Sequence, residues 1–350
     1  MSRDRMRELL LDSASRLFAE GYESDVHDRV DAGEWPAELW AAIEDNGLPA
    51  VLVPEERGGV GLTLSDAMAI LRLSGAFAVA APLAESMIGQ WLLAAADLEP
   101  VQGPIAIALA DGGIHGEDES AAALSRPLHG VPWLRSEAHL LVAGDEASGG
   151  SRLALFAIGE PATATSQNVA GEPRGSSAGG FEATAMARGV VASTSTERLR
   201  LLLALCRASQ IAGAMDRILD LTLEHANGRE QFGRPIGRFQ AVQQQIAVLA
   251  GEVALVGAAT DAAVSAWEQG GGEVLAAAAK ARASEAAHGV AAIAHQVHAA
   301  IGFTREHDLH RFTRRLWAWR DEWGSETEWQ EWIGRRAIAA GGDGLWPLLG

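Results

Sequence analysis

Three glutamates gather near the carboxyl end of the chain, in the segment RDEWGSETEW at residues 320–329. Glu322, Glu326 and Glu328 surround a tryptophan and a glycine there. Side-chain carboxylates are among the groups that transfer protons in active sites. The segment is therefore either an acidic catalytic cluster or the position from which a catalytic residue has been lost, and the rest of the sequence has to distinguish the two.

A second candidate is the segment HANGREQFGRPIGRFQAVQ, residues 225–243. Three glycines and a proline interrupt the helical periodicity between two long apolar repeats. Arg229 has the planar donor fork that binds a phosphate through two hydrogen bonds, and Phe232 can lie against a ring. The alternative interpretation is an interhelical loop whose arginines face solvent.

Four histidines lie in a third segment, HQVHAAIGFTREHDLHRF at residues 295–312. His295 and His298 are spaced to share one helix face, and so are His307 and His310. A zinc site would also need a carboxylate or cysteine at matching spacing, and no HExxH pattern is present. The sequence therefore predicts helix-end and surface histidines and no metal site.

Composition narrows the class of protein. The chain has 350 residues, 48% of them hydrophobic, which allows about two or three domains with large cores. A formal net charge of −18 argues against a nucleic-acid partner, because its phosphates would be repelled. Cys206 is the single cysteine, so no internal disulfide framework exists, and Lys280 is the single lysine. Cys206 lies in a leucine-rich stretch and is expected to be buried packing.

Targeting signals are not evident. The first residues, MSRDRMRELL, are charged and amphipathic, unlike a signal peptide. No window of about 20 residues is free of both charge and proline, so no membrane span is predicted. We therefore expect a cytoplasmic protein.

The chain divides into three regions by periodicity, and these regions have to position the candidate residues. Residues 1–100 show helical spacing, with a glycine-rich loop at VPEERGGVGLT and a capping arrangement of Thr63 and Asp66. Residues 101–192 alternate short apolar runs with turn residues and predict a small antiparallel β domain, with a loop over 163–185. Residues 193–350 return to helices of close to 30 residues each, which need mutual packing. The predicted fold class is α+β: an N-terminal helical domain, a middle β domain and a C-terminal four-helix bundle.

Three motifs together resemble those of the acyl-CoA dehydrogenases, which bind flavin adenine dinucleotide (FAD) and oxidise the Cα–Cβ bond of an acyl thioester. REQFGRPIGRFQ is similar to the family's R-x-x-F-G-x-x-I-x-x-F-Q segment. QVHAAIGFT is similar to Q-x-x-G-G-x-G-[FY]-T, and VPEERGGVGLTLSD to the amino-terminal V-P-E-E-x-G-G-x-G loop. The motifs occur in the family's order and spacing, and the resemblance covers most of the chain.

The resemblance implies where FAD is held. In the family, the first motif of one subunit reaches across a dimer interface to the pyrophosphate and adenosine end of FAD, which makes an oligomer obligatory. Carried over, Arg229 pairs with the pyrophosphate, and the other residues line the cofactor. The cofactor-binding residues implied are Arg229, Gln231, Phe232, Ile236, Gln240, Gln296, Ala300 and Ser325.

Two departures concern the cofactor. The family's paired glycines, which let the backbone approach FAD, are Ala299 and Ala300 here. The family's threonine- and serine-rich flavin-contacting stretch has no counterpart, and LADGGIHGEDESAAALSRPLHG stands in that region. The strand that follows is similar, so Trp133 matches a tryptophan beside the flavin, and Arg135 falls where a small hydroxyl residue is usual.

The third departure concerns the catalytic base. The family commonly carries it in an E-G-T triplet, which aligns with Trp323, Gly324 and Ser325. The alternative base position of some members aligns with Leu203. Glu322 is one residue away from the base position, which rotates a helical side chain by about 100°. It is the remaining candidate base.

Three hypotheses follow. In the first, the chain is a self-sufficient homo-oligomeric flavoenzyme (a dimer or tetramer) that uses Glu322 as a displaced base. In the second, it is a partner subunit that lacks the base and supplies adenosine-end contacts to FAD in a heterotetramer with a second acyl-CoA dehydrogenase-like chain. Bacterial enzymes of this kind act on steroid side-chain thioesters, and GFTREHDLHRF resembles that branch. In the third, it is a cofactor-free helical structural protein. The sequence favours the second hypothesis.

Overall fold

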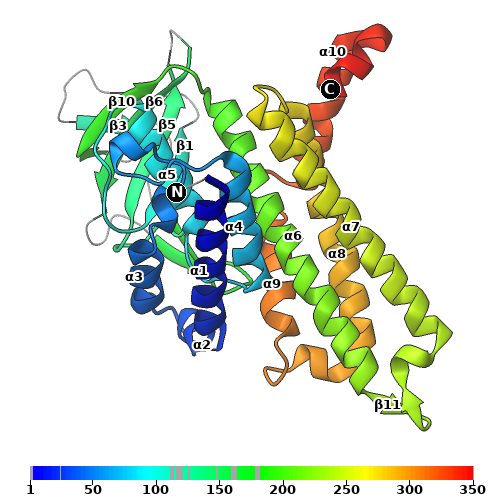
Figure 1. Ribbon diagram of the computed structural model, residues 1–350. Coiled ribbons are helices and arrows are strands. Elements are labelled where there is room, and N and C mark those ends of the chain that lie inside the picture. Colours follow the sequence, from blue (N-terminus) through cyan, green and yellow to red (C-terminus); the bar gives the residue numbers. More distant parts are fainter. Residues whose placement is uncertain are drawn as a thin grey trace. The chain divides into compact units, whose positions relative to one another are not determined.

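The computed structural model describes residues 3–23, 25–110, 114–115, 121–124, 127–146, 149–158, 164–177 and 182–349. The chain folds into two compact units (Figure 1). The first comprises Met1–Ala67 and Ala80–Leu203, and the second comprises Met68–Val79 and Ala204–Gly350. The helical amino-terminal region and the β region that follows it therefore share one compact unit.

Helices form the amino-terminal part of the first unit, as the periodicity predicts. Thr63 and Asp66 form the expected capping box before α4: Asp66 N–H donates to Thr63 Oγ1, and Thr63 N–H donates to the Asp66 carboxylate, both at 3.1 Å. α5 is buried along most of its length and packs against the first strand of the sheet. The helices of this region are α1 (Arg3–Glu23), α2 (Val26–Asp31), α3 (Ala37–Asp45) and α5 (Leu83–Ala95), together with α4 (Leu64–Ala76), which belongs to the second unit from Met68 onward.

A four-stranded sheet is the centre of the first unit. Its order is β1 (Ile105–Ala110), β5 (His139–Asp145), β6 (Ser151–Ala157) and β10 (Ala187–Val191). These strands lie within residues 101–192, where the short apolar runs predicted a β domain. The expectation of a purely antiparallel sheet is wrong for one pair, because β1 runs parallel to β5. The chain between them makes a long crossover, which a parallel pair requires.

The segment 163–185, predicted as a loop, contains strands in its described residues. β7 (Ala164–Gln167) and β8 (Pro173–Ser176) form a hairpin that continues to β4 (Val131–Pro132). β9 (Glu182–Thr184) joins β2 (Ile114–His115) and β3 (Ala121–Leu124). Backbone pairing builds these strands with few apolar side chains, so hydropathy does not reveal them.

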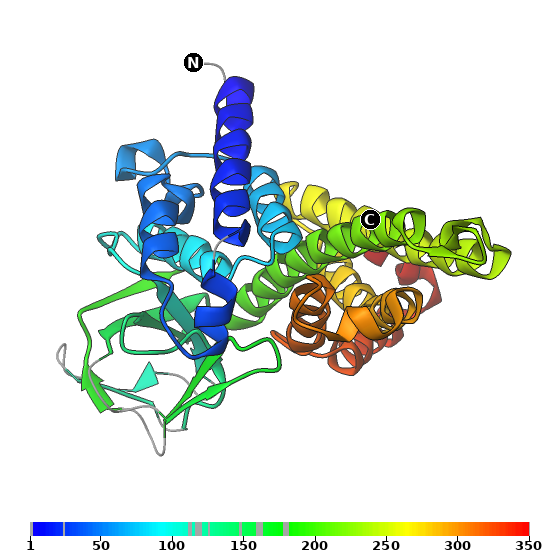
Figure 2. The same ribbon diagram turned by 90° about the horizontal axis from the view of Figure 1, so that it is seen from below.

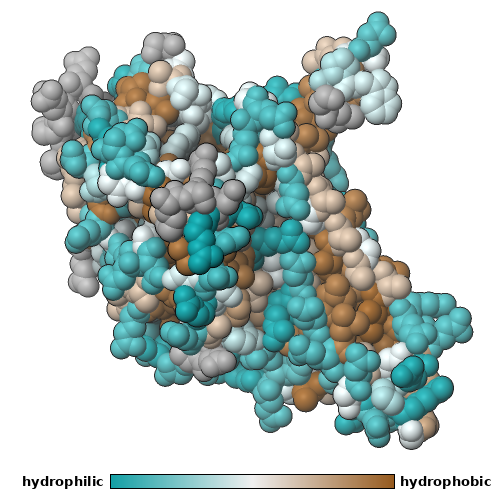
Figure 3. Space-filling view, in the orientation of Figure 1, coloured by the Kyte–Doolittle hydropathy of each residue, from teal (hydrophilic) through white to brown (hydrophobic). Residues whose placement is uncertain are grey.

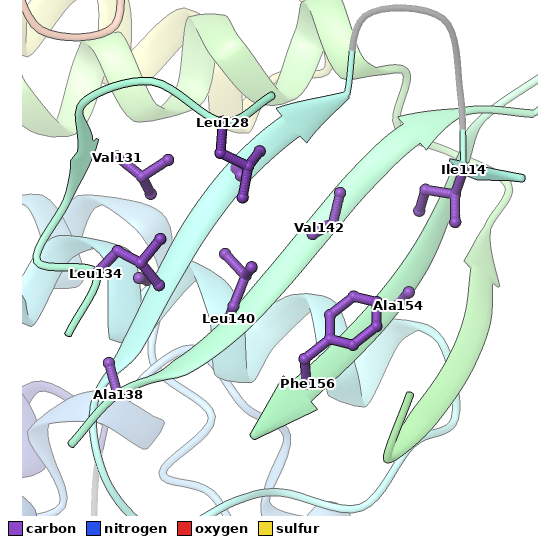
Figure 4. Close-up of a cluster of buried hydrophobic side chains, with 11 residues drawn as sticks. Ile114, Leu128, Val131, Leu134, Ala138, Leu140, Val142, Ala154 and Phe156 are labelled. Atoms are coloured by element: carbon purple, nitrogen blue, oxygen red, sulfur yellow. The ribbon is translucent and has the colours of Figure 1, made fainter. Parts of the chain in front are cut away.

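The core of the β region lies on one face of the main sheet (Figure 4). Alternate residues of β5, Leu140 and Val142, point into it beside Phe156 of β6. Leu128 and Leu134, which precede β5 in the chain, cover them. The sheet thus uses both faces, one for this cluster and the other for α5.

Long helices form the second unit, as predicted. Figures 1 and 2 show α7 running beside α8, and α8 also packs against α9 and α10. The long helices among the described residues are α6 (Thr196–Gly228), α7 (Gln240–Glu268), α8 (Glu273–His298), α9 (Leu309–Trp319) and α10 (Glu326–Leu349). Between α6 and α7 lie the strands β11 (Glu230–Gln231) and β12 (Arg234–Pro235) and a 3-10 turn (Ile236–Arg238), and a second 3-10 turn (Ala299–Phe303) follows α8.

One face of α7 is apolar and exposed. Val248 and Leu255 are 55% and 52% exposed, and Figure 3 shows hydrophobic side chains along this helix. By length and composition α7 also meets the criteria of a membrane span, with a window of mean hydropathy 1.6 of which 33% is buried. Since the core helices of many proteins meet the same criteria, the firmer observation is an uncovered apolar face, which is typical of a protein–protein interface.

Candidate functional site

The REQFGRPIGRFQ segment forms a short finger at the end of α6. Arg229 N–H donates to His225 O at 2.9 Å, and Ile236 N–H donates to Arg229 O at 2.8 Å. Phe232 and Gly233 make the turn between β11 and β12 with φ of +52° and +76°. Two-residue hairpin turns of this kind need positive φ at both positions. The finger is therefore built by its own backbone, and the Phe232 side chain at its tip is 94% exposed.

A pocket of about 720 Å³ lies between this finger and the end of α8. The first wall consists of the end of α6 and the finger, and the second is the end of α8 with the turn that follows it. Arg229 supplies a guanidinium group at one side, and the side chains of Ile236, Val297 and Ile301 supply an apolar lining. The lining residues are His225, Gly228, Arg229, Gln231, Ile236, Val297, His298, Ala299, Ala300 and Ile301.

Four of the eight predicted cofactor residues meet in this pocket: Arg229, Gln231, Ile236 and Ala300. They come from two segments that are far apart in the sequence. The other four do not line it. Phe232, Gln240 and Gln296 are exposed at the finger tip, at the start of α7 and on α8, and Ser325 precedes α10.

Backbone strain marks the second wall of the pocket. Ala299, the C-cap residue of α8, has φ +56° and ψ −141°. Glycine is the residue that adopts such angles without a steric penalty, and another residue held there costs about 1–3 kcal/mol. The glycine pair expected at this place thus has a physical reason, and alanine occupies the strained position in its stead.

The predicted base, Glu322, is engaged in an ion pair. Its Oε2 accepts a hydrogen bond of 2.7 Å from Arg207 Nε, and the two side chains are 10% and 3% exposed. Arg207 also contacts the Gln210 side chain and lies 5.6 Å from the centre of the Trp319 ring. If Glu322 acted as a base, it would become protonated and lose its charge in this buried ion pair, which is costly.

Trp323 and Gly324 form a turn that replaces the expected acidic site. Trp323 is half-buried and has φ +57°, and Gly324 has φ +112°. A Cβ at Gly324 would clash with the Trp329 indole, so the glycine is required by packing. The indole of Trp323 has no proton-accepting nitrogen lone pair, so it cannot act as a base.

Glu328 and Ser325 form hydrogen bonds with each other at the start of α10. Ser325 Oγ and N–H both donate to the Glu328 carboxylate, at 3.0 and 2.7 Å. Glu328 N–H donates back to Ser325 Oγ at 3.4 Å, which completes a capping box. Glu328 therefore caps this helix from an exposed position, and the Ser325 hydroxyl is already engaged.

Lys280 is hydrogen-bonded to the backbone on both sides of Trp323, at Arg320 and at Gly324. Its fully buried ammonium group donates to Ser284 Oγ at 2.8 Å, Arg320 O at 2.7 Å and Gly324 O at 2.8 Å. Three acceptors match the three donors of the ammonium. Burial lowers the pKa of Lys280 to about 7.

In the first unit, Trp133 is packed inside the protein. It is 2% exposed, has φ +58°, and lies in a small cluster with Val30, Ala80 and Trp35. The Trp35 ring meets it edge-on at 6.4 Å between ring centres. Arg135 is paired with Glu137 at 2.7 Å beside them. Trp133 is thus covered by the chain's own aromatic side chain. The segment 109–130, where the flavin-contacting stretch is missing, lies partly outside the described residues.

Three histidines form a cluster that the sequence did not predict. His298 stacks on His225 at 4.5 Å between ring centres, and His307 meets His298 at 4.6 Å. His295, which the spacing places on the same helix as His298, stacks against Phe303 and Trp317 and is not part of this cluster. No local spacing brings His225 to His298, because they lie at the ends of different helices. The other predicted features, Leu203 and Cys206, are both buried.

Comparison with known proteins gives consistent matches. Residues 5–97 match the model of the acyl-CoA dehydrogenase N-terminal domain, and residues 191–336 match that of the acyl-CoA dehydrogenase C-terminal domain. Acyl-CoA dehydrogenase IpdE2 of Mycobacterium tuberculosis is 32% identical over 290 residues, which are 79% of this chain and 79% of that protein.

Solved structures with the same fold cover nearly the whole chain. The ChsE4-ChsE5 complex from Mycobacterium tuberculosis matches with a TM-score of 0.83 and 25% identity, over 95% of this chain and 97% of that one. A variant of the Tcur3481-Tcur3483 steroid ACAD matches with a TM-score of 0.84 and 24% identity, over 97% of this chain and 100% of that one.

Proposed function

Because the chain belongs to the acyl-CoA dehydrogenase family, we propose that it is the partner subunit of a heteromeric enzyme that oxidises an acyl-CoA thioester. In this proposal it supplies adenosine-end contacts to FAD, and the second chain supplies the catalytic base. The resemblance of GFTREHDLHRF to the steroid-side-chain branch suggests a steroid-derived acyl group and a cytoplasmic enzyme.

The pocket between the finger and α8 fits the adenosine diphosphate end of FAD. Arg229 offers a guanidinium fork for the pyrophosphate, and Gln231 offers amide donors and acceptors. Ile236 and Ile301 give an apolar surface for a planar ring. When bound, FAD accepts the hydride that leaves the β carbon of the thioester, and this chain's residues position it.

The observation that carries the proposal is that no carboxylate stands at either position where the family resemblance places the catalytic base. Trp323 stands at the base position, and Glu322, one residue away, is bound to Arg207. The alternative position holds Leu203, which is buried. Neither of the two expected positions therefore carries a carboxylate that can act as the base. A second chain is therefore needed to remove the α proton.

Two features support the heteromer. Trp133 is covered by Trp35 in its own unit, which argues that this chain does not hold a flavin ring against that indole. The exposed Phe232 and the apolar face of α7 are surfaces for another chain to cover. The matching solved structure is itself a complex of two differently named chains, ChsE4 and ChsE5.

Expression alone and with a partner tests the proposal. We expect the single chain to be colourless, and to yield a yellow complex with FAD when co-expressed with a catalytic acyl-CoA dehydrogenase chain encoded nearby. Bound FAD and acyl-CoA turnover by the chain alone would favour the homo-oligomer with Glu322 as base, and no flavin with any partner would favour the structural protein.

An Arg229→Ala variant tests the site itself. The complex should lose FAD readily on gel filtration, because the pyrophosphate loses its guanidinium partner. Arg238→Ala is the matched control, since Arg238 is also exposed on this loop but does not line the pocket. Equal FAD retention by both variants would show that the pocket is not the cofactor site.

A further inference from the structure

We propose that His225, His298 and His307 bind a divalent transition-metal ion, such as Zn²⁺ or Co²⁺, at the edge of the pocket. One ring nitrogen of each residue lies within 4.8 Å of those of the other two. The residues come from the last turn of α6, the last turn of α8 and the turn before α9. The proposal does not rest on the assignment of FAD to this pocket, although two of the histidines line it, and it departs from the sequence, which predicted no metal.

His298 is poised as a ligand. Its Nδ1 lies 2.8 Å from Ala294 O and donates to it, which leaves the lone pair on Nε2. The side chain is 2% exposed, and Nε2 makes no hydrogen bond of normal geometry within the described residues, although the Leu221 backbone also interacts with the ring. A buried polar atom without a partner is costly, and a backbone carbonyl on the opposite nitrogen is the usual support of a metal-bound imidazole.

His225 and His307 are the other two proposed ligands, and they differ in the contacts that metal binding would change. His225 is half-buried, and one of its ring nitrogens already lies within 4.8 Å of a nitrogen of each of the other two residues. Leu309 N–H donates to His307 Nδ1 at 3.1 Å, so in this state His307 Nε2 carries the proton. Coordination by His307 therefore replaces the Leu309 contact, either by taking the Nδ1 lone pair or by turning the ring.

The chemistry of the cluster selects the class of metal. His298 is buried and His225 and His307 are half-buried, and each offers a ring nitrogen as a neutral ligand. Neutral imidazoles without a thiolate suit Zn²⁺, Co²⁺, Ni²⁺ or Cu²⁺, whereas Ca²⁺ and Mg²⁺ need oxygen ligands. His225 and His298 also line the pocket, so a fourth ligand can enter from there.

Metal binding would link the ends of α6 and α8, which line the pocket, with the turn before α9. The end of α6 leads into Arg229, and the end of α8 leads into Ala299 and Ala300. A shared ion would fix these ends relative to one another and restrain both walls. We therefore expect the bound metal to raise the unfolding temperature of the protein.

Titration with Co²⁺ tests the site, because cobalt with nitrogen ligands gives visible absorption bands. The full chain, without a polyhistidine tag and treated with a chelator, should bind one Co²⁺, and Zn²⁺ should displace it. His298→Gln should weaken binding roughly tenfold or more. His288→Gln, exposed on α8 outside the cluster, should bind as the native chain does.

The outcomes separate cleanly. Absence of a cobalt band, or equal binding by native chain and His298→Gln, overturns the proposal. Should His298→Gln fail to fold, His225→Gln decides by the same comparison, since His225 is only half-buried. Melting curves with and without Zn²⁺ should show a stabilising shift in the native chain that is lost in the variant.

Discussion

Two residues of this chain, Ala299 and Trp323, adopt backbone conformations with positive φ at positions where the family resemblance leads one to expect other residue types. Ala299 takes backbone angles suited to glycine, and Trp323 takes a positive φ where a base is expected. Both positions border features that the sequence resemblance assigns to chemistry. The strain is local, so it can be measured by single substitutions.

Ala299→Gly should stabilise the protein by about 1 kcal/mol, because relief of strain exceeds the entropy that glycine adds to the unfolded chain. Urea unfolding measures the change. Ala300→Gly is the control, since Ala300 is not at positive φ, and it should be neutral or destabilising. A destabilised Ala299→Gly variant would show that Ala299 is not strained.

Lys280 predicts a pH dependence of stability. Its pKa is about 7 in the folded chain against 10.5 ordinarily, so between these values folding releases a proton. Stability linked to this group is complete above pH 10.5 and is lost as pH falls toward 7. The charges near it are Asp321, Glu328, Arg207 and Arg320.

The free energy of unfolding of the native chain, relative to Lys280→Met, should therefore rise as the pH increases above 7. Urea unfolding of both proteins across that range gives the difference directly, and other titrating groups cancel. A difference that does not change with pH would mean that Lys280 remains protonated in the folded state.

The grouping of motif residues in one place was predictable where motifs are local and not where contacts are distant, while the binding of FAD by these residues stays a prediction. Arg229, Gln231, Ile236 and Ala300 meet in one pocket, as the resemblance implies. The Arg207–Glu322 pair joins residues 115 positions apart, and no spacing rule reveals it. The histidine cluster was missed for the same reason.

At the scale of elements, apolar periodicity predicted the long helices and the main strands. It missed the hairpin of β7 and β8, whose strands are held by backbone pairing, and it could not give the parallel direction of β1. Hydropathy also could not say which face of α7 stays uncovered, since that depends on how α8 packs against it.

The uncovered face of α7 makes an element-scale prediction. Leu255→Asp should leave the isolated chain folded, because Leu255 is 52% exposed, but should reduce its assembly with a partner or with itself. Light scattering after gel filtration measures the mass. Gln269→Asp, just beyond α7, is the control and should assemble normally. Unchanged assembly of Leu255→Asp would place the interface elsewhere.

For the whole molecule, the proposed division of labour fixes a stoichiometry. If this chain supplies only adenosine-end contacts, the assembled enzyme should carry one FAD for every two chains. A homo-oligomer with a complete site in each chain would carry one FAD per chain. Visible absorbance of the released flavin, set against protein from amino-acid analysis, distinguishes the two ratios.

The single buried lysine has a practical consequence for chemical labelling. Amine-reactive reagents should find no lysine side chain on the folded surface, because Lys280 is fully buried. Any acylation detected at Lys280 by mass spectrometry would then report that α8 and the turn at Gly324 had separated. The rate of Lys280 acylation therefore measures how often this part of the chain opens, and the measurement needs no engineered probe.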